Sequence, residues 1–146
     1  MKLKKRSIVI FIMLNLTFFN CKTNEVKGII INSTLYTDQT YTSNRELVGL
    51  IKQILKKDEK ALISINDFQC VGAAGCYDLG FVVTQLIYKM GEEEFIKMID
   101  KLSVQQKQGI KGLIEIGLEY GDNDKDNKMD ETTIFKAFPQ LNKTLN

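Results

Sequence analysis

The stretch LGFVVTQLIYKM, residues 79–90, decides the fold, because its apolar side chains recur at intervals of three and four. That spacing places them on one face of an α-helix, and Gly91 is a typical residue at the end of such a helix. We therefore predict that residues 79–90 form the central helix of a helical core.

The sequence before this helix repeats the same periodicity twice. Ser43 and Glu46 have the spacing of a capping box, and apolar residues continue along one helical face as far as Leu55. Asp58 is placed to cap a second helix that carries apolar residues up to Ile65. These two segments predict two amphipathic helices in front of the central one.

The sequence after Gly91 predicts two further long helices. The first opens with the consecutive carboxylates of residues 92–94, which interact favourably with the positive end of a helix dipole. The second opens at Ser103, where Gln106 completes another capping-box spacing, and ends at Gly121.

A last short helix is predicted over Glu131–Phe138, stopped by Pro139, the only proline of the chain. All these segments are helical in pattern, and the connections between them are short. The sequence therefore predicts an all-α fold, either a small bundle of about five to six amphipathic helices or a set of stacked helical hairpins.

The first 21 residues have the organisation of an export signal: a basic head, Met1–Arg6, an apolar stretch, Ser7–Phe19, and then Cys21. This pattern resembles a bacterial lipoprotein signal peptide whose cleavage box departs from the usual one at residues 18–20. The resemblance implies cleavage before Cys21 and a lipid on Cys21 that holds the protein to a membrane of the bacterial cell envelope. Lys22, and not an aspartate retention signal, follows Cys21, and by the same resemblance this favours the outer membrane, facing the periplasm. An uncleaved anchor and ordinary secretion are the alternatives.

The chain is thus expected to consist of a signal peptide at 1–20, a tether at 21–43 and a helical domain at 44–146. The tether is dominated by Thr, Asn, Ser and Gln. Its one apolar patch, Ile29–Ile31, leaves a second interpretation open, in which this patch forms a short strand or docks on the domain.

Charge argues against a nucleic-acid partner. The chain has 20 basic and 18 acidic residues, but four of the basic residues lie in the leader, so the remainder carries a net charge of −2. A nucleic-acid-binding domain needs a basic face, and none is visible in the pattern.

The number of cysteines is consistent with a location in the cell envelope. If Cys21 carries lipid, Cys70 and Cys76 remain as a pair, and an oxidising compartment allows them to form a disulfide. The alternative is two buried, reduced thiols. Their spacing is not that of a Cys-x-x-Cys redox site, and the chain has no histidine to complete a zinc site.

One segment has the pattern of a metal site. Carboxylates occupy the first, third, fifth and ninth positions of a loop that begins at Asp122, and the apolar Met129 occupies the eighth. This resembles an EF-hand calcium loop, although Asn127 replaces the usual glycine and the twelfth residue is not a glutamate. The ligand set that the resemblance implies is Asp122, Asp124, Asp126, Lys128, Asp130 and Thr133. The alternative interpretation, favoured by the missing bidentate carboxylate, is a solvated acidic turn that binds no cofactor.

A second cluster, residues 66–80, combines the two cysteines with glycines and carboxylates. We expect Asp67, Tyr77 and Asp78 to contact a partner from a loop that the disulfide pins. The simplest structural roles are a cap or turn for Asp67 and a first-turn helix residue for Asp78. Catalysis is disfavoured, because two carboxylates act as general acid and base only where the fold brings them together in a cleft.

These observations predict a lipid-anchored cell-envelope protein that is not an enzyme. Its helical domain is expected to be a protein-binding module, for example an immunity-type inhibitor that neutralises an incoming toxin. The alternative is a calcium-binding envelope adaptor or stability element that uses the 122–133 loop. A hydrolase that uses Asp67 or Asp78 ranks third.

Overall fold

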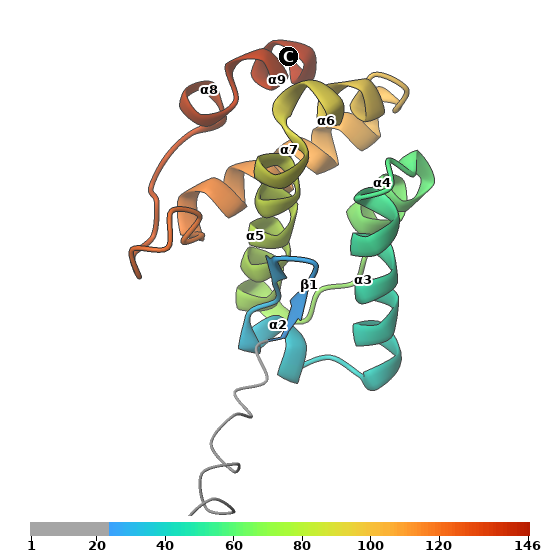
Figure 1. The fold of residues 1–146 in the computed structure, drawn as a ribbon, viewed down its shortest axis with the longest axis vertical. Coiled ribbons are helices and arrows are strands. Elements are labelled where there is room, and N and C mark those ends of the chain that lie inside the picture. The colour runs from blue at the N-terminus through green and yellow to red at the C-terminus, as the bar shows by residue number, and fades with distance from the viewer. Residues whose placement is uncertain (1–23) are drawn as a thin grey trace, which may run out of the picture.

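The computed structural model describes residues 24–146, so the predicted leader and Cys21 lie outside the described residues (Figure 1). Within that range the chain forms eight helices and one two-stranded sheet, which confirms the all-α prediction. The strands are β1 (Glu25–Val26) and β2 (Ile29–Ile30), and the helices are α2 (Ser33–Thr37), α3 (Tyr41–Ile54), α4 (Glu59–Asn66), α5 (Gly72–Met90), α6 (Glu92–Ile99), α7 (Val104–Tyr120), α8 (Ile134–Ala137) and α9 (Pro139–Leu145). Among the described helices, none has both the length and the apolarity needed to cross a bilayer.

Helix α5 is the centre of the molecule, as the sequence predicts. Figure 1 shows α5 in the middle, with α3 along one side of it and the loop that leads from α7 to α8 on the other. Leu79, Val82 and Leu86 of α5 are almost fully buried. Their burial joins the helices around α5 into one hydrophobic core.

The closest packing is between α5 and α7. A Cβ atom built on Gly117 would lie 2.1 Å from the carbonyl oxygen of Gly80, and one built on Gly80 would lie 2.6 Å from the carbonyl oxygen of Leu113. The two helices therefore touch backbone to backbone, which only glycine allows.

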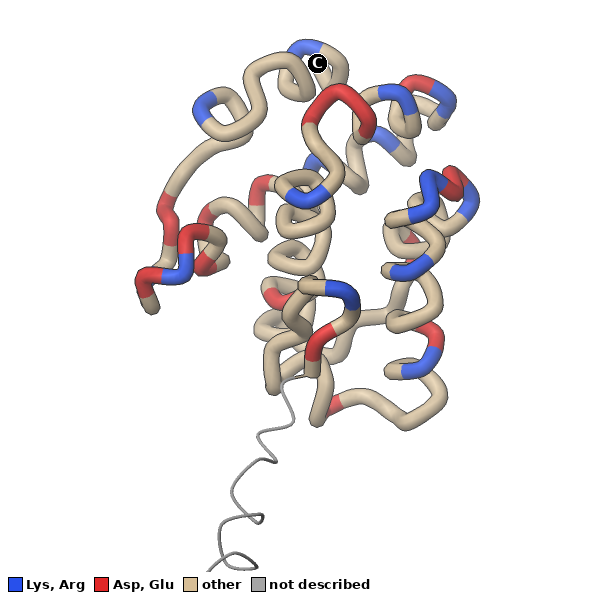
Figure 2. The backbone as a smooth tube through the Cα atoms, in the orientation of Figure 1, with Lys and Arg blue, Asp and Glu red and all other residues tan. Residues whose placement is uncertain are grey.

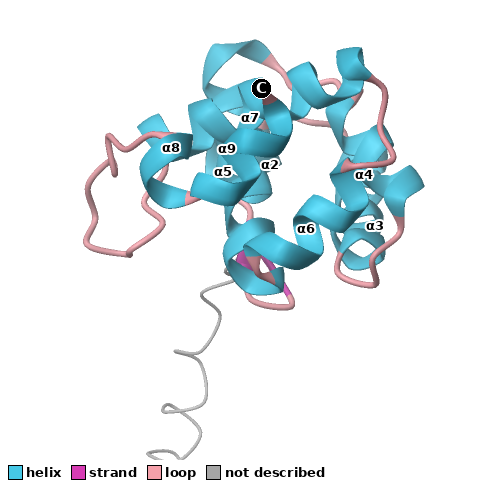
Figure 3. Cartoon of the chain, turned by 90° about the horizontal axis from the view of Figure 1, so that it is seen from above, coloured by secondary structure: helices cyan, strands magenta, loops and turns pink. Residues whose placement is uncertain are grey.

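Two helices close the end of the molecule that carries the C-terminus. α6 and α9 lie over this end, as the view from above also shows (Figures 1 and 3). Phe95 of α6 is completely buried, and the Glu92 carboxylate accepts a hydrogen bond of 2.7 Å from the backbone N–H of Leu141 in α9.

The predicted helix starts are confirmed where they depend on a local cap. Asp58 accepts a hydrogen bond from the backbone N–H of Lys60, and Ser103 and Gln106 form a complete capping box at the start of α7. The start of α3 differs, because the hydroxyl of Thr40, rather than that of Ser43, accepts the capping hydrogen bond.

Two predicted helices differ from the structure in their bounds. α5 begins at Gly72, so the expected loop between the cysteines is mostly helix, because Ala73 and Ala74 are strong helix formers that extend the helix back to Gly72. The helix predicted over Glu131–Phe138 is the shorter α8, which ends before Pro139 as expected. Pro139 then begins a further helix, α9, at whose first position its missing N–H removes no helical hydrogen bond.

The segment predicted as a tether is part of the folded domain from residue 24 onward. Lys27 and Gly28 both have positive φ, as a tight hairpin turn requires, and they join β1 to β2. The side-chain amide of Gln85 in α5 then pairs with the backbone of Ile30, accepting from its N–H at 2.8 Å and donating to its carbonyl at 3.0 Å. Ile29 is 1% exposed, so burial of this apolar patch outweighs the polar composition around it. The alternative of a short docked strand is thereby confirmed.

Candidate functional site

The acidic loop lies between α7 and α8 and is organised by its own carboxylates. The Asp122 carboxylate accepts a hydrogen bond of 3.1 Å from the backbone N–H of Asn127, and Asp124 accepts one of 3.1 Å from the N–H of Asp126. Asn127 has a φ of 66°, the left-handed conformation that asparagine tolerates better than most residues. The chain therefore turns tightly at the sixth position of the loop, where an EF-hand has glycine.

Three of the predicted metal ligands converge. Asp122, Asp124 and Asp130 each offer a carboxylate oxygen, and these oxygens lie within 4.8 Å of one another. The Oδ1 atom of Asp122 is fully buried and has no hydrogen-bond donor. A buried carboxylate oxygen without a donor is costly unless a cation or a water compensates it.

The other three predicted ligands are not in this group. Asp126 accepts a hydrogen bond of 2.8 Å from the N–H of Lys128, and its second oxygen lies 3.8 Å from the Lys128 ammonium. Thr133 is the residue before α8, where its carbonyl accepts hydrogen bonds from the first turn of that helix. The described structure thus brings together three of the four predicted aspartates.

Two residues that the sequence did not single out fasten the loop to the core. The side-chain oxygen of Asn123 accepts a hydrogen bond of 2.8 Å from the hydroxyl of Thr84, which is completely buried in α5. The amide nitrogen of Asn123 donates to the carbonyl of Gly117 at 3.0 Å and to the carboxylate of Asp130 at 2.5 Å. The one signal for this contact in the sequence is Thr84 itself, a polar residue within the apolar face of residues 79–90.

The loop carries uncompensated negative charge. Residues 122–131 contain five acidic and two basic side chains, a net charge of −3, and Figure 2 shows the acidic positions grouped along this loop. Burial raises the pKa of the Tyr88 hydroxyl above its usual value, and the negative charges of Asp130 and Asp124 raise this pKa further. The negative charges of the loop therefore act on the Tyr88 side chain of α5.

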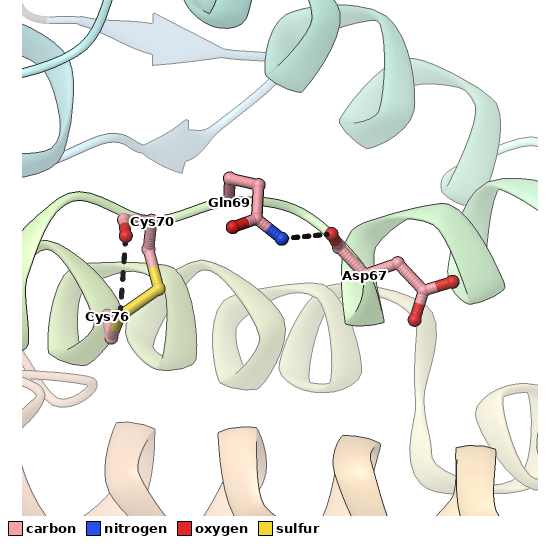
Figure 4. Close-up of a disulfide and its surroundings, with 4 residues drawn as sticks. All are labelled: Asp67, Gln69, Cys70 and Cys76. Atoms are coloured by element: carbon pink, nitrogen blue, oxygen red, sulfur yellow. Dashed lines mark hydrogen bonds between the residues drawn. A yellow bond between two sulfur atoms is a disulfide. The ribbon is translucent and has the colours of Figure 1, made fainter.

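The predicted disulfide is present at the start of α5. The sulfur atoms of Cys70 and Cys76 are bonded, with their Cα atoms 5.1 Å apart, and the bridge joins the α4–α5 linker to the second turn of α5 (Figure 4). In the same view the Asp67 carboxylate points away from the bridge, while the carbonyl of Asp67 accepts a hydrogen bond of 3.4 Å from the Gln69 amide.

Asp67, Tyr77 and Asp78, which were predicted to contact a partner, each make a different contact within the domain. Asp78 lies in the second turn of α5, and its carboxylate accepts hydrogen bonds of 3.0 Å from the Asn32 amide and from the N–H of Leu35. It therefore caps α2 in place of a local side chain. Tyr77 stacks on Tyr120 of α7, with ring centroids 4.4 Å apart, and Asp67 ends α4.

Two shallow grooves flank the acidic loop. One, of about 580 Å³, is lined by Glu115, Glu119 and the start of α8, and the other, of about 600 Å³, is lined by Ile30, Phe81 and the loop itself. Tyr120 and Met129 line both grooves. Met129 is 60% exposed, so an apolar side chain stands between the two grooves.

Comparison with protein-family models, curated proteins and solved structures finds no match to this chain.

Proposed function

We propose that this chain is a lipid-anchored protein of the bacterial cell envelope whose helical domain is a non-catalytic module that binds Ca²⁺ in the 122–133 loop. The observation that carries the calcium site is the convergence of Asp122, Asp124 and Asp130 around a carboxylate oxygen that is buried without a donor. The lipid anchor is supported by the pattern of the first 21 residues.

Calcium suits this loop because it is a hard cation that takes several oxygen ligands in flexible geometry. Three carboxylates on a tightly turning chain supply such oxygens, and water molecules can complete the shell. A missing bidentate carboxylate weakens binding, so we expect a dissociation constant in the 10⁻⁴ to 10⁻³ M range, roughly that of extracellular calcium modules.

Calcium titration of the mature chain tests this site. We expect a saturable heat of binding and a rise in Tm, since a ligand at 100 times its dissociation constant stabilises the folded state by about 2.7 kcal/mol. Asp124→Asn removes one clustered carboxylate and lowers the affinity roughly ten-fold or more, because affinity depends on the number of charged ligands.

Asp126→Asn is the matched control, since it makes the same change of charge in the same loop at a residue outside the cluster. This variant is expected to keep the wild-type affinity. The absence of any heat or Tm shift at 100 times the expected dissociation constant, or an equal loss in both variants, contradicts the site.

A protein-binding role, such as immunity-type inhibition of a toxin, is the second candidate function. It is favoured by the exposed Met129 between the two grooves, because apolar side chains beside polar rims are typical of protein interfaces. We expect the wild-type chain to recover a stoichiometric protein partner from envelope extract, and Met129→Glu to lose it.

Val104→Glu is the control for that experiment. Val104 is 77% exposed and begins α7, at the opposite end of that helix from the acidic loop. If the wild type, Met129→Glu and Val104→Glu all recover the same partner, the grooves beside Met129 do not bind it.

A further inference from the structure

The folded domain begins very close to the proposed lipid. Asn24 is already held in the domain, because its carbonyl accepts a hydrogen bond of 2.7 Å from the N–H of Ile31. Cys21 lies three residues earlier in the sequence, and three extended residues span at most about 10 Å. A lipid on Cys21 would therefore hold the domain against the membrane instead of at the end of a long tether.

The surface beside Asn24 is a pair of adjoining grooves between the hairpin and α3. The first, of about 420 Å³, runs from Asn24 along β1, and the second, of about 300 Å³, runs along α3. They share three lining residues, so they form one continuous surface. We call it the N-terminal face and define it by Lys27, Tyr36, Tyr41, Arg45, Val48 and Lys52.

The N-terminal face has the side chains of a membrane interface. Tyr41 is 76% exposed and Tyr36 is 37% exposed, and tyrosine is enriched where one end of a ring meets hydrocarbon and the other meets water. The Arg45 guanidinium lies 5.8 Å from the centre of the Tyr41 ring, so a cation stands beside the most exposed aromatic side chain of the face.

The charge of the face is opposite to that of the domain. Four charged residues line the two grooves, Glu25 and the three cations of the face, which gives +2, whereas residues 24–146 as a whole carry −3. The ion pairs formed among the described residues use other lysines, so Lys27, Arg45 and Lys52 are available to bind anions. Figure 2 shows basic positions at the tip of the hairpin and along α3.

We infer that the N-terminal face rests on the surface of an anionic phospholipid bilayer when Cys21 carries its lipid. This inference rests on the proposed lipid anchor and adds to it an orientation. The short connection brings the face to the headgroups, its cations bind lipid phosphates, and its tyrosines lie in the interface. The end of the molecule formed by α6, α8 and α9 then points away from the membrane (Figure 1).

Single tryptophans test this orientation, since the chain has none of its own. Tyr41→Trp places one on the N-terminal face, and Phe135→Trp places a matched one on α8, where Phe135 is 70% exposed. The full chains are produced in a bacterial host, and the membrane-bound proteins are reconstituted in nanodiscs that contain phosphatidylglycerol and nitroxide-labelled phosphatidylcholine. We expect Tyr41→Trp to lose most of its fluorescence and Phe135→Trp to keep it.

A third variant adds Arg45→Glu and Lys52→Glu to Tyr41→Trp and is expected to recover much of the lost emission. Mass spectrometry of the same samples separates the two proposals. A chain without lipid on Cys21 overturns the proposed anchor and the orientation with it. A lipidated chain in which both tryptophans are quenched equally, or in which Tyr41→Trp is not quenched, overturns the orientation alone.

Discussion

Gly117→Ala is expected to destabilise the domain by about 3 kcal/mol, although alanine is the better helix former. The added methyl group would lie 2.1 Å from the carbonyl oxygen and 2.4 Å from the carbonyl carbon of Gly80. These are backbone atoms in the middle of α5, so no side-chain rotation relieves the clash. The two helices must separate instead, which disturbs the packing of the whole core. Thermal and urea unfolding measure the effect, and we expect the Tm to fall by roughly 10 °C.

Gly112→Ala in the same helix is the matched control. A Cβ atom on Gly112 has no neighbour within 4 Å, so only the gain in helix propensity remains. This variant is expected to be more stable than the wild type by up to about 1 kcal/mol. If Gly117→Ala were as stable as Gly112→Ala, the backbone contact between α5 and α7 would be wrong.

Cys21→Ser is expected to abolish lipid attachment completely. The proposed lipid is carried by the thiol of Cys21, and a serine offers no sulfur for it. Metabolic labelling of bacteria with a clickable fatty acid should mark the wild-type chain and leave Cys21→Ser unmarked. The label is a better readout than membrane fractionation, because an uncleaved apolar leader can itself keep the variant on the membrane.

The double variant Cys70→Ser and Cys76→Ser controls for labelling at other cysteines. These two residues form the disulfide and have no free thiol, so the double variant is expected to label like the wild type. Mass spectrometry should show a wild-type chain that begins at Cys21. An unlabelled wild-type chain that retains residues 1–20 would refute both the anchor and the orientation built on it.

Local signals in the sequence predicted most of the helices. Asp58, Ser103 and Gln106 cap the helices that their spacing indicated, because a cap depends on residues only two or three positions away. The apolar periodicity of residues 79–90 likewise identified the central helix, since burial of one helical face imposes it directly.

Contacts between distant residues could not be predicted in the same way. The hairpin depends on Gln85, which is 55 residues from its partner Ile30, and two-residue strands leave almost no periodic pattern. The cap of α2 is supplied by Asp78 from another helix, so the sequence around α2 contains no sign of it.

In the candidate site, too, the local features were predicted and the contact between distant residues was not. The spacing of the aspartates indicated the loop, and the structure brings Asp122, Asp124 and Asp130 together. The hydrogen bond between Asn123 and Thr84 joins residues 39 positions apart, and it depends on how α7 packs on α5. A spacing rule describes a loop by itself and therefore misses the contact that holds it in place.

The docking of the hairpin and α2 on α5 also sets the shortest stable fragment of this protein. A truncation that starts at residue 44, where the helical pattern is strong, would uncover the core side chains that Ile29 and Leu35 bury in the intact chain. It would also leave the amide of Gln85 and the carboxylate of Asp78 without their backbone partners. Recombinant work on the folded domain should accordingly begin at Asn24, and shorter versions are expected to aggregate.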